Sequence, residues 1–397
     1  MPASRAVKRS NALERDPPGT IPIGWQLEDP FLTVEITLGP RRPLIVKRRR
    51  GQIAPDRGDE IGASLTDLTR YYERVIKAYA FFDESNPSAA LTNIARIGQG
   101  LFQTLFNEEE RRAIRQRRDE SILAEKNHRM EVGVGQYVPP KIHVIADQVN
   151  IPWEFVYIDD TGTEPVVPEG FLGTSFFIQQ NIFMNKSRWL APKPMAREFG
   201  VQLYTYDDLP AASGQEIPTV KRMLQAAGIL AEDAPALDGT KGTTDQLARS
   251  INSSSADLLH FACHAGISKE SGKVEICVND HYTADDLEIR NHLEPSKNGA
   301  FVFLNCCELS TTDSTQYNDI ISEFLKSNFS SIIATEIEID DTEACNFSEV
   351  LYDLLLNHRC GSLQNAVFHA RRIFREQHDS YVGYTYSYYG NFDLLIT

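Results

Sequence analysis

Hydrophobic and polar residues change their spacing along the chain, and these changes predict its elements. FLTVEITL (31–38) and PLIVKRRR (43–50) alternate apolar and polar positions around GPRR, which predicts a β-hairpin. Three segments at about 64–82, 89–106 and 108–126 then carry apolar residues at helical intervals. We therefore expect a hairpin followed by a helical region.

Charged residues accompany these first segments. Lys47 to Arg50 form a basic cluster, which we interpret as a solvated strand end, with a docking patch for an acidic partner as the alternative. Ser64 is expected to cap the first helix. The third helix is rich in arginine, and these side chains are expected to form a solvated face with acidic partners four residues away. The arginines are Arg111, Arg112, Arg115, Arg117 and Arg118.

From Lys141 onwards, short apolar runs alternate with segments of helical spacing. The predicted strands are KIHVIA, WEFVYI, FFIQQNIFM, VQLYTY, DLLHFACHAG, KVEICV, FVFLNCC and SIIATEI. The predicted helices cover about 217–227, 244–252, 318–327, 342–358 and 362–377, with one more after Thr283, and the expected caps are Thr243, Thr283, Asp341 and Ser362. Such alternation is typical of a mostly parallel sheet covered by helices on both faces.

Two of the predicted strands end in reactive side chains. His264 follows the apolar run LLHFAC, and Cys306 and Cys307 follow FVFLN. The carboxyl ends of parallel strands form catalytic and ligand sites, and a nucleophilic cysteine needs an imidazole nearby. The 43 positions from His264 to Cys307 leave room for a hairpin and a crossover helix. The pattern therefore predicts that the histidine and the cysteine lie side by side at one edge of the sheet.

These segments resemble a known family. HFACHAG followed by FVFLNCCELS is similar to the approximate pattern HFxGHG and LxxCxxG of the CHAT group of caspase-like cysteine peptidases, relatives of caspases and separases. VNIPWEFVY (149–157), SIIATEIEIDD (331–341) and YTYSYYGNF (384–392) resemble further segments of that family, in the family's order. The resemblance covers about residues 136–397.

The chain departs from the family pattern at a few positions. Ala265 stands where the family usually has glycine, and Ile337 and Glu338 replace a Trp–Pro pair. The tetratricopeptide repeats that many CHAT proteins carry are not recognisable in this sequence. Because that sensor array is missing, we expect a separate protein or a bound signal to order the active site, through mobile loops at 208–216 and 265–272.

By resemblance, the fold class is α/β, a caspase-like three-layer sandwich with a mostly parallel sheet between helices. Residues 1–60 are expected to form an N-terminal tail and hairpin, and residues 61–135 a helical region. Residues 136–397 then form the CHAT peptidase, with a non-catalytic pseudo-caspase half at 136–195 and a catalytic half at 196–397.

The same resemblance assigns roles to residues. Cys307 is the expected nucleophile and His264 its catalytic partner, and the backbone N–H groups of Cys307 and Ala265 form the expected oxyanion hole. Cys306 points to the opposite face of the strand, and His260 is expected to be a satisfied core residue, or one that supports the site from behind, and not the base. A zinc site built from HFACH and the paired cysteines is an alternative that we disfavour, because its spacing does not match structural zinc sites. The remaining cysteines, expected in the core, are Cys263, Cys277, Cys345 and Cys360.

The segment after SIIAT predicts the substrate preference. By resemblance it leads into the S1 pocket, and Glu336, Glu338 and Asp340 alternate along it. A carboxylate in that pocket favours Arg, and then Lys, before the cleaved bond, because a guanidinium pairs with a carboxylate bidentately. The alternative is that Asp340 and Asp341 only begin the next helix.

Charge and composition limit the classes of function that the chain can have. The formal net charge is −15, which argues against nucleic-acid binding. Residues 1–130 carry 22 basic and 18 acidic residues, and residues 131–397 carry 18 and 37, so the second region has a charge of −19 and could attract basic peptide.

No apolar run approaches the ~18 residues of a membrane span, no secretory signal is recognisable, and scattered cysteines favour a reducing cytoplasm. No metal or other cofactor is expected, because the zinc pattern is disfavoured and no phosphate-binding loop is recognisable.

These observations predict a regulated cysteine endopeptidase that cleaves a protein substrate. By association with the family, we expect a bacterial effector of defence or programmed death that works with an activating or sensor protein. One alternative is a pseudo-peptidase that keeps the fold as a binding or scaffold module, which Ala265 and the missing Trp–Pro pair favour. Another is a cysteine hydrolase that acts on a non-peptide acyl group.

Overall fold

The computed structural model describes most of the chain. The described residues are 32–37, 44–48, 74–75, 78, 87–131, 139–146, 151–161, 166–181, 191–194, 199–206, 209–235, 245–267, 274–279, 282–307, 314–336, 339–357, 360–378, 380–390 and 392–395. Most of the helix expected at 64–82, and the side chains of the Lys47–Arg50 cluster, lie outside them.

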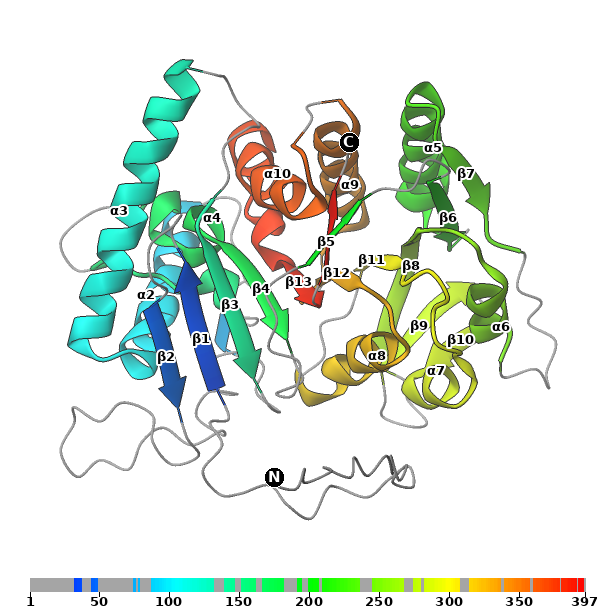
Figure 1. Ribbon diagram of the computed structural model, residues 1–397, viewed down its shortest axis with the longest axis horizontal. Helices are drawn as coiled ribbons and strands as arrows, with labels where there is room; N and C mark the ends of the chain where they lie inside the picture. Colours follow the sequence, from blue (N-terminus) through cyan, green and yellow to red (C-terminus); the bar gives the residue numbers. More distant parts are fainter. Residues whose placement is uncertain are drawn as a thin grey trace, which may run out of the picture.

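Twelve described strands form one mixed sheet (Figure 1). They are β1 (Leu32–Thr37), β2 (Leu44–Arg48), β3 (Lys141–Ala146), β4 (Phe177–Asn181), β6 (Gly200–Thr205), β7 (Leu230–Asp233), β8 (Leu258–Ile267), β9 (Val274–Asn279), β10 (Tyr282–Asp285), β11 (Phe301–Cys307), β12 (Ser331–Thr335) and β13 (Tyr386–Gly390). Two short strands, β5 (Ala191–Pro194) and β14 (Phe392–Leu395), pair separately.

The helices that surround this sheet agree with the predicted alternation. They are α2 (Pro87–Leu105), α3 (Glu108–Glu131), α4 (Leu172–Ser175), α5 (Ile217–Ala226), α6 (Gln246–Ser253), α7 (Asp286–His292), α8 (Ser314–Lys326), α9 (Asp341–Leu356) and α10 (Leu363–His378).

Five parallel neighbours carry the predicted catalytic strands. Their order is β7–β6–β8–β11–β12. In chain order this is 2-1-3-4-5, so the order reverses between β6 and β8, which is where ligands bind in doubly wound sheets. The hairpin of β9 and β10 follows β8, and β9 lies antiparallel to the second half of β8. This hairpin and α7 separate β8 from β11, which confirms the connection expected from the spacing.

Strand β13 joins the two halves of the sheet. It is antiparallel to β12 on one side and parallel to β4 on the other. β3 lies parallel to β4, and β1 and β2 follow in antiparallel pairing. The predicted hairpin is therefore confirmed, and it extends the same sheet as β8 and β11.

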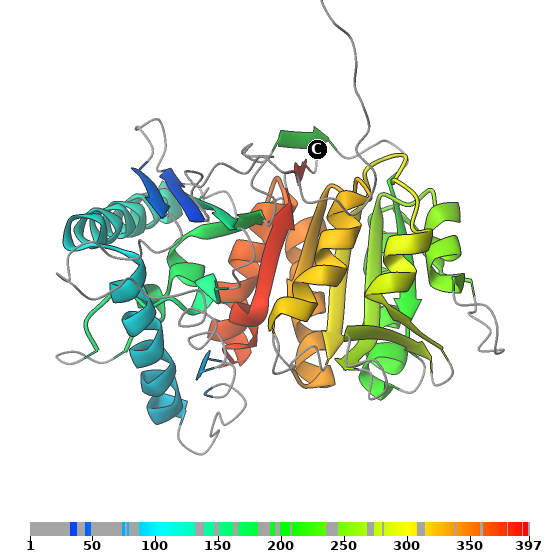
Figure 2. The same ribbon diagram turned by 90° about the horizontal axis from the view of Figure 1, so that it is seen from below.

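Helices cover both faces of the sheet (Figure 2). On one face α5 and α9 pack over the five parallel strands and α10 packs beside α9 near β4, and we call their shared interior the front core. On the other face α6, α7 and α8 pack over β8, β11 and β12 in the rear core. α2 and α3 pack on β3 and β4 in a third core. This arrangement confirms the predicted α/β sandwich with a mostly parallel sheet.

Two segments differ from the prediction. WEFVYI does not form the expected strand, because Trp153–Phe155 is a 3₁₀ turn after Pro152. All three side chains of the turn are buried, so this apolar run reflects enclosure by other elements and not strand pairing. The connection expected as a loop at 208–216 is helical in most of its described part, where residues 212–216 form a π-helical turn that runs directly into α5.

One predicted helix cap is confirmed, and another lies one residue away from the predicted position. Asp340, not Asp341, caps α9, and its carboxylate accepts a hydrogen bond from the Thr342 N–H at 2.9 Å. Ser362 precedes α10 as expected, and its hydroxyl accepts from the Asn365 N–H at 3.2 Å.

Two other caps do not lie where the sequence pattern put them. Thr283 is part of β10, and α7 begins only at Asp286. α6 begins at Gln246 after Asp245, while Thr243 lies outside the described residues. α6 and α7 thus each begin two residues later than predicted.

Candidate active site

The two predicted catalytic strands lie side by side. β8 and β11 are parallel neighbours, and their register pairs His264 with Cys307. Neighbouring strands are about 4.8 Å apart, so this pairing brings the two Cα atoms to about that distance. The sheet therefore brings together, at the carboxyl ends of two strands, the residues that the sequence motifs singled out.

Side-chain alternation assigns the pair to one face. Cys306 is fully buried in the rear core. Phe303 faces the front core, and position 307 continues its alternation. His264 is two positions after Ala262, which also lies in the front core. Both positions therefore belong to the face that α5 and α9 cover, although the thiol of Cys307 itself lies outside the described residues.

His264 lies where the strand order reverses. The ring of Tyr206, which follows β6, packs edge-on against the imidazole with ring centroids 5.0 Å apart. The imidazole is partly exposed, and its Nδ1 is buried with no hydrogen-bond partner among the described residues. One ring nitrogen is thus available for proton exchange with a thiol or a substrate.

The residue after His264 lies in regular strand. Ala265 pairs with Ile276 of β9, and its side chain is fully buried in the rear core. Among the described residues other than glycine, only Asn328 has a positive φ. Because Ala265 does not adopt a left-handed backbone, the replacement of the family's glycine causes no backbone strain here.

The three acidic residues expected near the S1 pocket have different surroundings. Glu336 is only 3% exposed, and its Oε1 accepts from Tyr389 Oη at 2.7 Å and from Gln180 Nε2 at 3.1 Å. Asp340 is exposed and caps α9, in agreement with the alternative that this segment begins a helix. Glu338 lies outside the described residues.

Glu336 belongs to a buried group of charged residues. Arg371 of α10 donates to Glu154 Oε1 at 3.0 Å and to the Tyr386 carbonyl at 2.5 Å, and Ser387 Oγ donates to Glu154 Oε2 at 2.9 Å. Burial, with the negative charge of Glu154, raises the pKa of Glu336 to about 8. Burial also raises the pKa of Glu154 and lowers that of Arg371. Burial therefore favours the protonated form of the Glu336 carboxyl, and Arg371 is the cation that faces Glu154 in this group.

Sequence reasoning missed a second buried polar group, below the His264–Cys307 pair. Glu216 of the π-helical turn is 2% exposed; Asn305 Nδ2 donates to its Oε1 at 2.7 Å, and His260 Nε2 lies 2.9 Å from the same oxygen. His260 is confirmed as a satisfied core residue, since its Nδ1 lies 3.2 Å from Tyr352 Oη and its ring stacks on Phe303. The available signal was the presence of His260 and Asn305 inside otherwise apolar strands.

The family of the chain follows from a sequence-model match. Residues 108–385 match the CHAT domain. The chain belongs to the CHAT domain family. This membership and the topology described above establish a caspase-like α/β fold and place the chain among cysteine peptidase-type proteins. The match begins at the first residue of α3, earlier than the boundary expected near residue 136.

Two solved structures resemble this CHAT protein at low sequence identity. One is the Saccharomyces cerevisiae separase–securin complex, with 14% identity, 62% of this chain and 15% of that chain covered, and a TM-score of 0.37. The other is the Drosophila initiator caspase Dronc, with 14% identity, coverage of 53% and 88%, and a TM-score of 0.33. The CHAT protein thus spans a small part of the first chain's length. No curated protein matches it.

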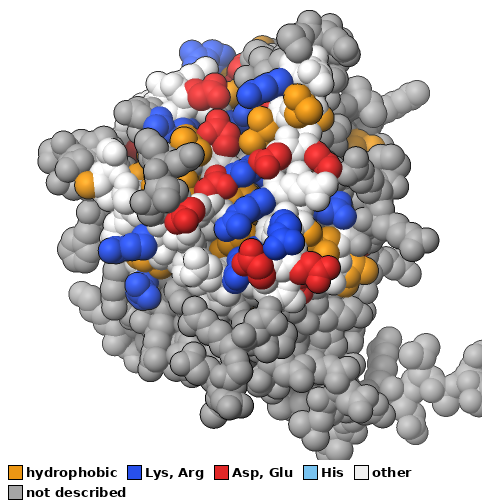
Figure 3. Space-filling view, turned by 90° about the vertical axis from the view of Figure 1, so that its left-hand side faces the viewer, with side chains coloured by type: hydrophobic (Ala, Val, Ile, Leu, Met, Phe, Trp, Pro, Cys, Tyr) orange, Lys and Arg blue, Asp and Glu red, His pale blue; other side chains and the backbone are white. Residues whose placement is uncertain are grey.

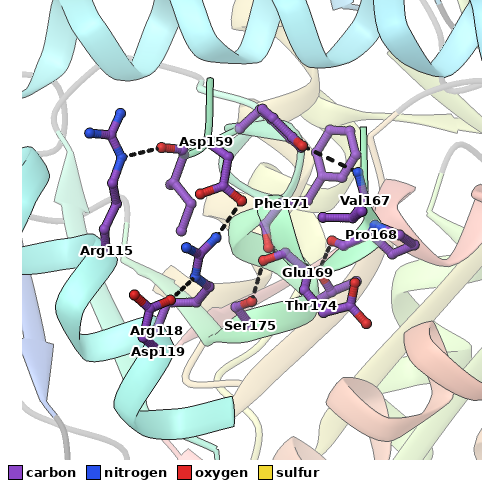
Figure 4. Close-up of polar contacts among 12 residues, drawn as sticks. Arg115, Arg118, Asp119, Asp159, Val167, Pro168, Glu169, Phe171, Thr174 and Ser175 are labelled. Carbon is purple, nitrogen blue, oxygen red and sulfur yellow. Dashed lines mark hydrogen bonds and ion pairs between the residues drawn. The ribbon is translucent and has the colours of Figure 1, made fainter. Parts of the chain in front are cut away.

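Two arginines of α3 hold this helix against the segment that follows the 3₁₀ turn (Figure 4). Arg115 Nε donates to the Ile158 carbonyl at 2.6 Å, and Arg118 pairs with Asp159. On the side of the molecule that carries α3, acidic, basic and apolar side chains are interspersed (Figure 3). The prediction of a solvated arginine face is therefore wrong for these two residues, because both reach the segment that follows the 3₁₀ turn.

Neither a cluster that could bind a metal ion nor a helix that could span a membrane is found in the described part of the CHAT protein. No three or more His, Cys, Asp or Glu side chains there are grouped so that they could hold a metal ion. None of the helices described combines the length and the hydrophobicity that crossing a bilayer requires. None of the cysteines whose side chains are described forms a disulfide bond. Cys263, Cys306, Cys345 and Cys360 are buried, whereas Cys277, which was expected in the core, is partly exposed.

Proposed function

We propose that this CHAT protein is a cysteine endopeptidase in which Cys307 is the nucleophile and His264 the general acid–base. The supporting observation is the β8–β11 register, which pairs these two residues at the carboxyl ends of adjacent strands. In this reaction the Cys307 thiolate attacks a peptide carbonyl, and His264 protonates the departing amine. The backbone N–H groups of Cys307 and Ala265 are the proposed donors to the developing oxyanion.

The test is labelling of the full chain by a peptidyl acyloxymethyl ketone, a probe that reacts with activated thiols. We expect one label per chain, lost in Cys307→Ala and kept in Cys306→Ala. The second variant is the matched control, because Cys306 is the adjacent cysteine and is buried in the rear core. Equal labelling of both variants would contradict the proposed nucleophile. Failure of the wild-type chain to react, even with its partner bound, would favour the pseudo-peptidase alternative.

We further propose cleavage after a basic residue, with Arg preferred to Lys. The charge of −19 on residues 131–397 supports this, since an acidic surface concentrates basic peptides. Among the three predicted carboxylates, Glu336 is buried, which favours its protonated form, and Asp340 is engaged as a helix cap. The proposed ion pair therefore rests on Glu338 or on rearrangement of the segment when substrate binds.

A positional peptide library with the active protein measures this preference. We expect Arg at the P1 position to raise kcat/KM at least tenfold over an apolar residue, because losing a buried charged partner costs orders of magnitude in selectivity. Glu338→Gln is expected to reduce the advantage of Arg, and Glu336→Gln to leave it unchanged. A preference for Asp or for large apolar residues at P1 would exclude the proposal.

We also propose that a separate protein controls this site, since the sequence carries no recognisable sensor repeats. An effector role in bacterial defence or programmed death, in the cytoplasm, is part of the same proposal and rests on association with the family. Full activity of the purified chain alone would contradict control by a partner.

A further inference from the structure

One buried carboxylate contacts both catalytic strands. Glu216 Oε1 accepts from Asn305 Nδ2 of β11 at 2.7 Å and lies 2.9 Å from His260 Nε2 of β8. All three side chains are at most 2% exposed. Leaving a buried carboxylate without hydrogen-bond donors costs folding free energy. The two hydrogen bonds to Glu216 therefore hold the two strands and the π-helical turn in one relative position.

Asn305 has a partner for each of its polar atoms. Its Nδ2 also donates to the Ala344 carbonyl of α9 at 3.0 Å, and its Oδ1 accepts from Tyr386 Oη of β13 at 2.5 Å. It therefore connects β11 to three other elements. Asn305 is two residues before Cys307 on the same face, about 6.6 Å along the strand. Its amide is thus placed to fix the strand end that carries the proposed nucleophile.

His260 fixes the other strand in the same way. It lies four residues before His264 on the same face of β8, and it is held between Glu216 and Tyr352 of α9. Stacking on Phe303 of β11, at a centroid distance of 4.8 Å, adds a direct contact between the two strands. Glu216 is therefore the common partner of two residues that each support one member of the proposed dyad.

We propose that Glu216 is a positioning residue for the His264–Cys307 dyad, acting through Asn305 and His260 and carried by the π-helical turn at 212–216. This inference rests on the proposed peptidase function. Insertions of this π type occur frequently at functional sites, because they turn a side chain in a direction that a regular helix would not allow. Displacing a catalytic group by about 1 Å costs rate by as much as about 100-fold, and this sets the size of the expected effect.

The experiment separates alignment from binding by measuring kinact and KI for the acyloxymethyl ketone probe on the full chain. Glu216→Leu keeps the volume but removes both hydrogen bonds, and we expect kinact to fall about 10- to 100-fold with KI changed less than about threefold. Glu216→Gln should keep kinact within about threefold of wild type. Its amide oxygen, in the place of Oε1, can accept from Asn305 Nδ2 and from a protonated His260 Nε2, so the geometry survives without the charge.

A second pair of variants covers the case in which Glu216→Leu does not fold. Asn305→Asp places two carboxylates against each other and should lower kinact. Combining it with Glu216→Gln restores a donor–acceptor pair between positions 216 and 305, and should recover about tenfold of the loss. The rescue is partial, because the new carboxylate still faces the Ala344 carbonyl to which Asn305 donates. Ser250→Ala is the control, since it removes a buried hydrogen bond to Tyr204 in the rear core, at 3.2 Å, and should leave kinact unchanged.

The outcomes distinguish this inference from the function on which it rests. Unchanged kinact in folded Glu216→Leu and Asn305→Asp, with the wild-type chain labelled at Cys307, would overturn the positioning role alone. A fall in kinact without rescue by Glu216→Gln would also overturn it, because the geometry would then not be the cause. A wild-type chain that is not labelled at Cys307 would remove the proposed function, and the positioning role with it.

Discussion

Replacing His264 with alanine is expected to lower kcat for peptide cleavage by about 100- to 10,000-fold, with little change in KM. The imidazole is the proposed donor of the proton that the departing amine needs, and Cys307 is its neighbour in the strand register. Without the imidazole, the thiol loses the group that accepts its proton. The effect should therefore fall on the chemical step and not on substrate binding.

The control for this variant is His143→Gln. His143 is another buried histidine of the same sheet, but it lies in β3 of the other half. Activity within about threefold of wild type is expected for that variant, with folding checked by its thermal midpoint. If His264→Ala retained more than a tenth of the wild-type kcat, the histidine would not be the general acid–base.

Replacing Arg371 with methionine is expected to destabilise the protein by about 3–5 kcal/mol. Arg371 is fully buried, and its partner Glu154 is equally inaccessible to solvent. Removing the guanidinium leaves the Glu154 carboxylate without its counter-charge in a medium of low polarity. The Arg371 Nε and Nη1 atoms lack hydrogen-bond partners among the described residues, so the native arginine is itself incompletely satisfied.

Urea unfolding of the full chain measures this effect. Arg249→Met is the control, because the Arg249 side chain is 71% exposed, pairs with Asp245, and should contribute at most about 1 kcal/mol. Adding Glu154→Gln to Arg371→Met should recover part of the loss, because the buried charge is then removed. Equal destabilisation by the two arginine variants would show that the buried pair has no special role.

Local sequence patterns predicted the strands and helices in which apolar and polar residues follow a regular spacing. The strands around His264 and Cys307 are short apolar runs that end in polar residues, and both lie where the pattern put them. The spacing between them also predicted the hairpin and helix of the connection. WEFVYI failed because its side chains are buried on all sides, so that an apolar run no longer distinguishes a strand from a turn.

The parts that could not be predicted depend on distant pairings. Nothing in the spacing of YTYSYYGNF indicates that β13 lies between β12 and β4, since that choice depends on which edges are free in space. In the sequence, Glu216 resembles any polar residue that precedes a helix. Its role appears only when the π-helical turn directs it between two strands that lie about 45 and 90 residues further along the chain.

The position of β13 has a consequence for the order in which the protein forms. Gln179 of β4 donates a hydrogen bond to Gly390 of β13, 211 residues later. At ~5–20 residues per second, a ribosome needs roughly 10–40 s to cover that distance. The Glu336 N–H, at the start of the proposed S1 segment, also binds Thr385 just before β13, at 2.8 Å. The proposed S1 segment therefore gains this contact only when β13 is made, so a nascent chain that already holds His264 and Cys307 still lacks the support of that segment.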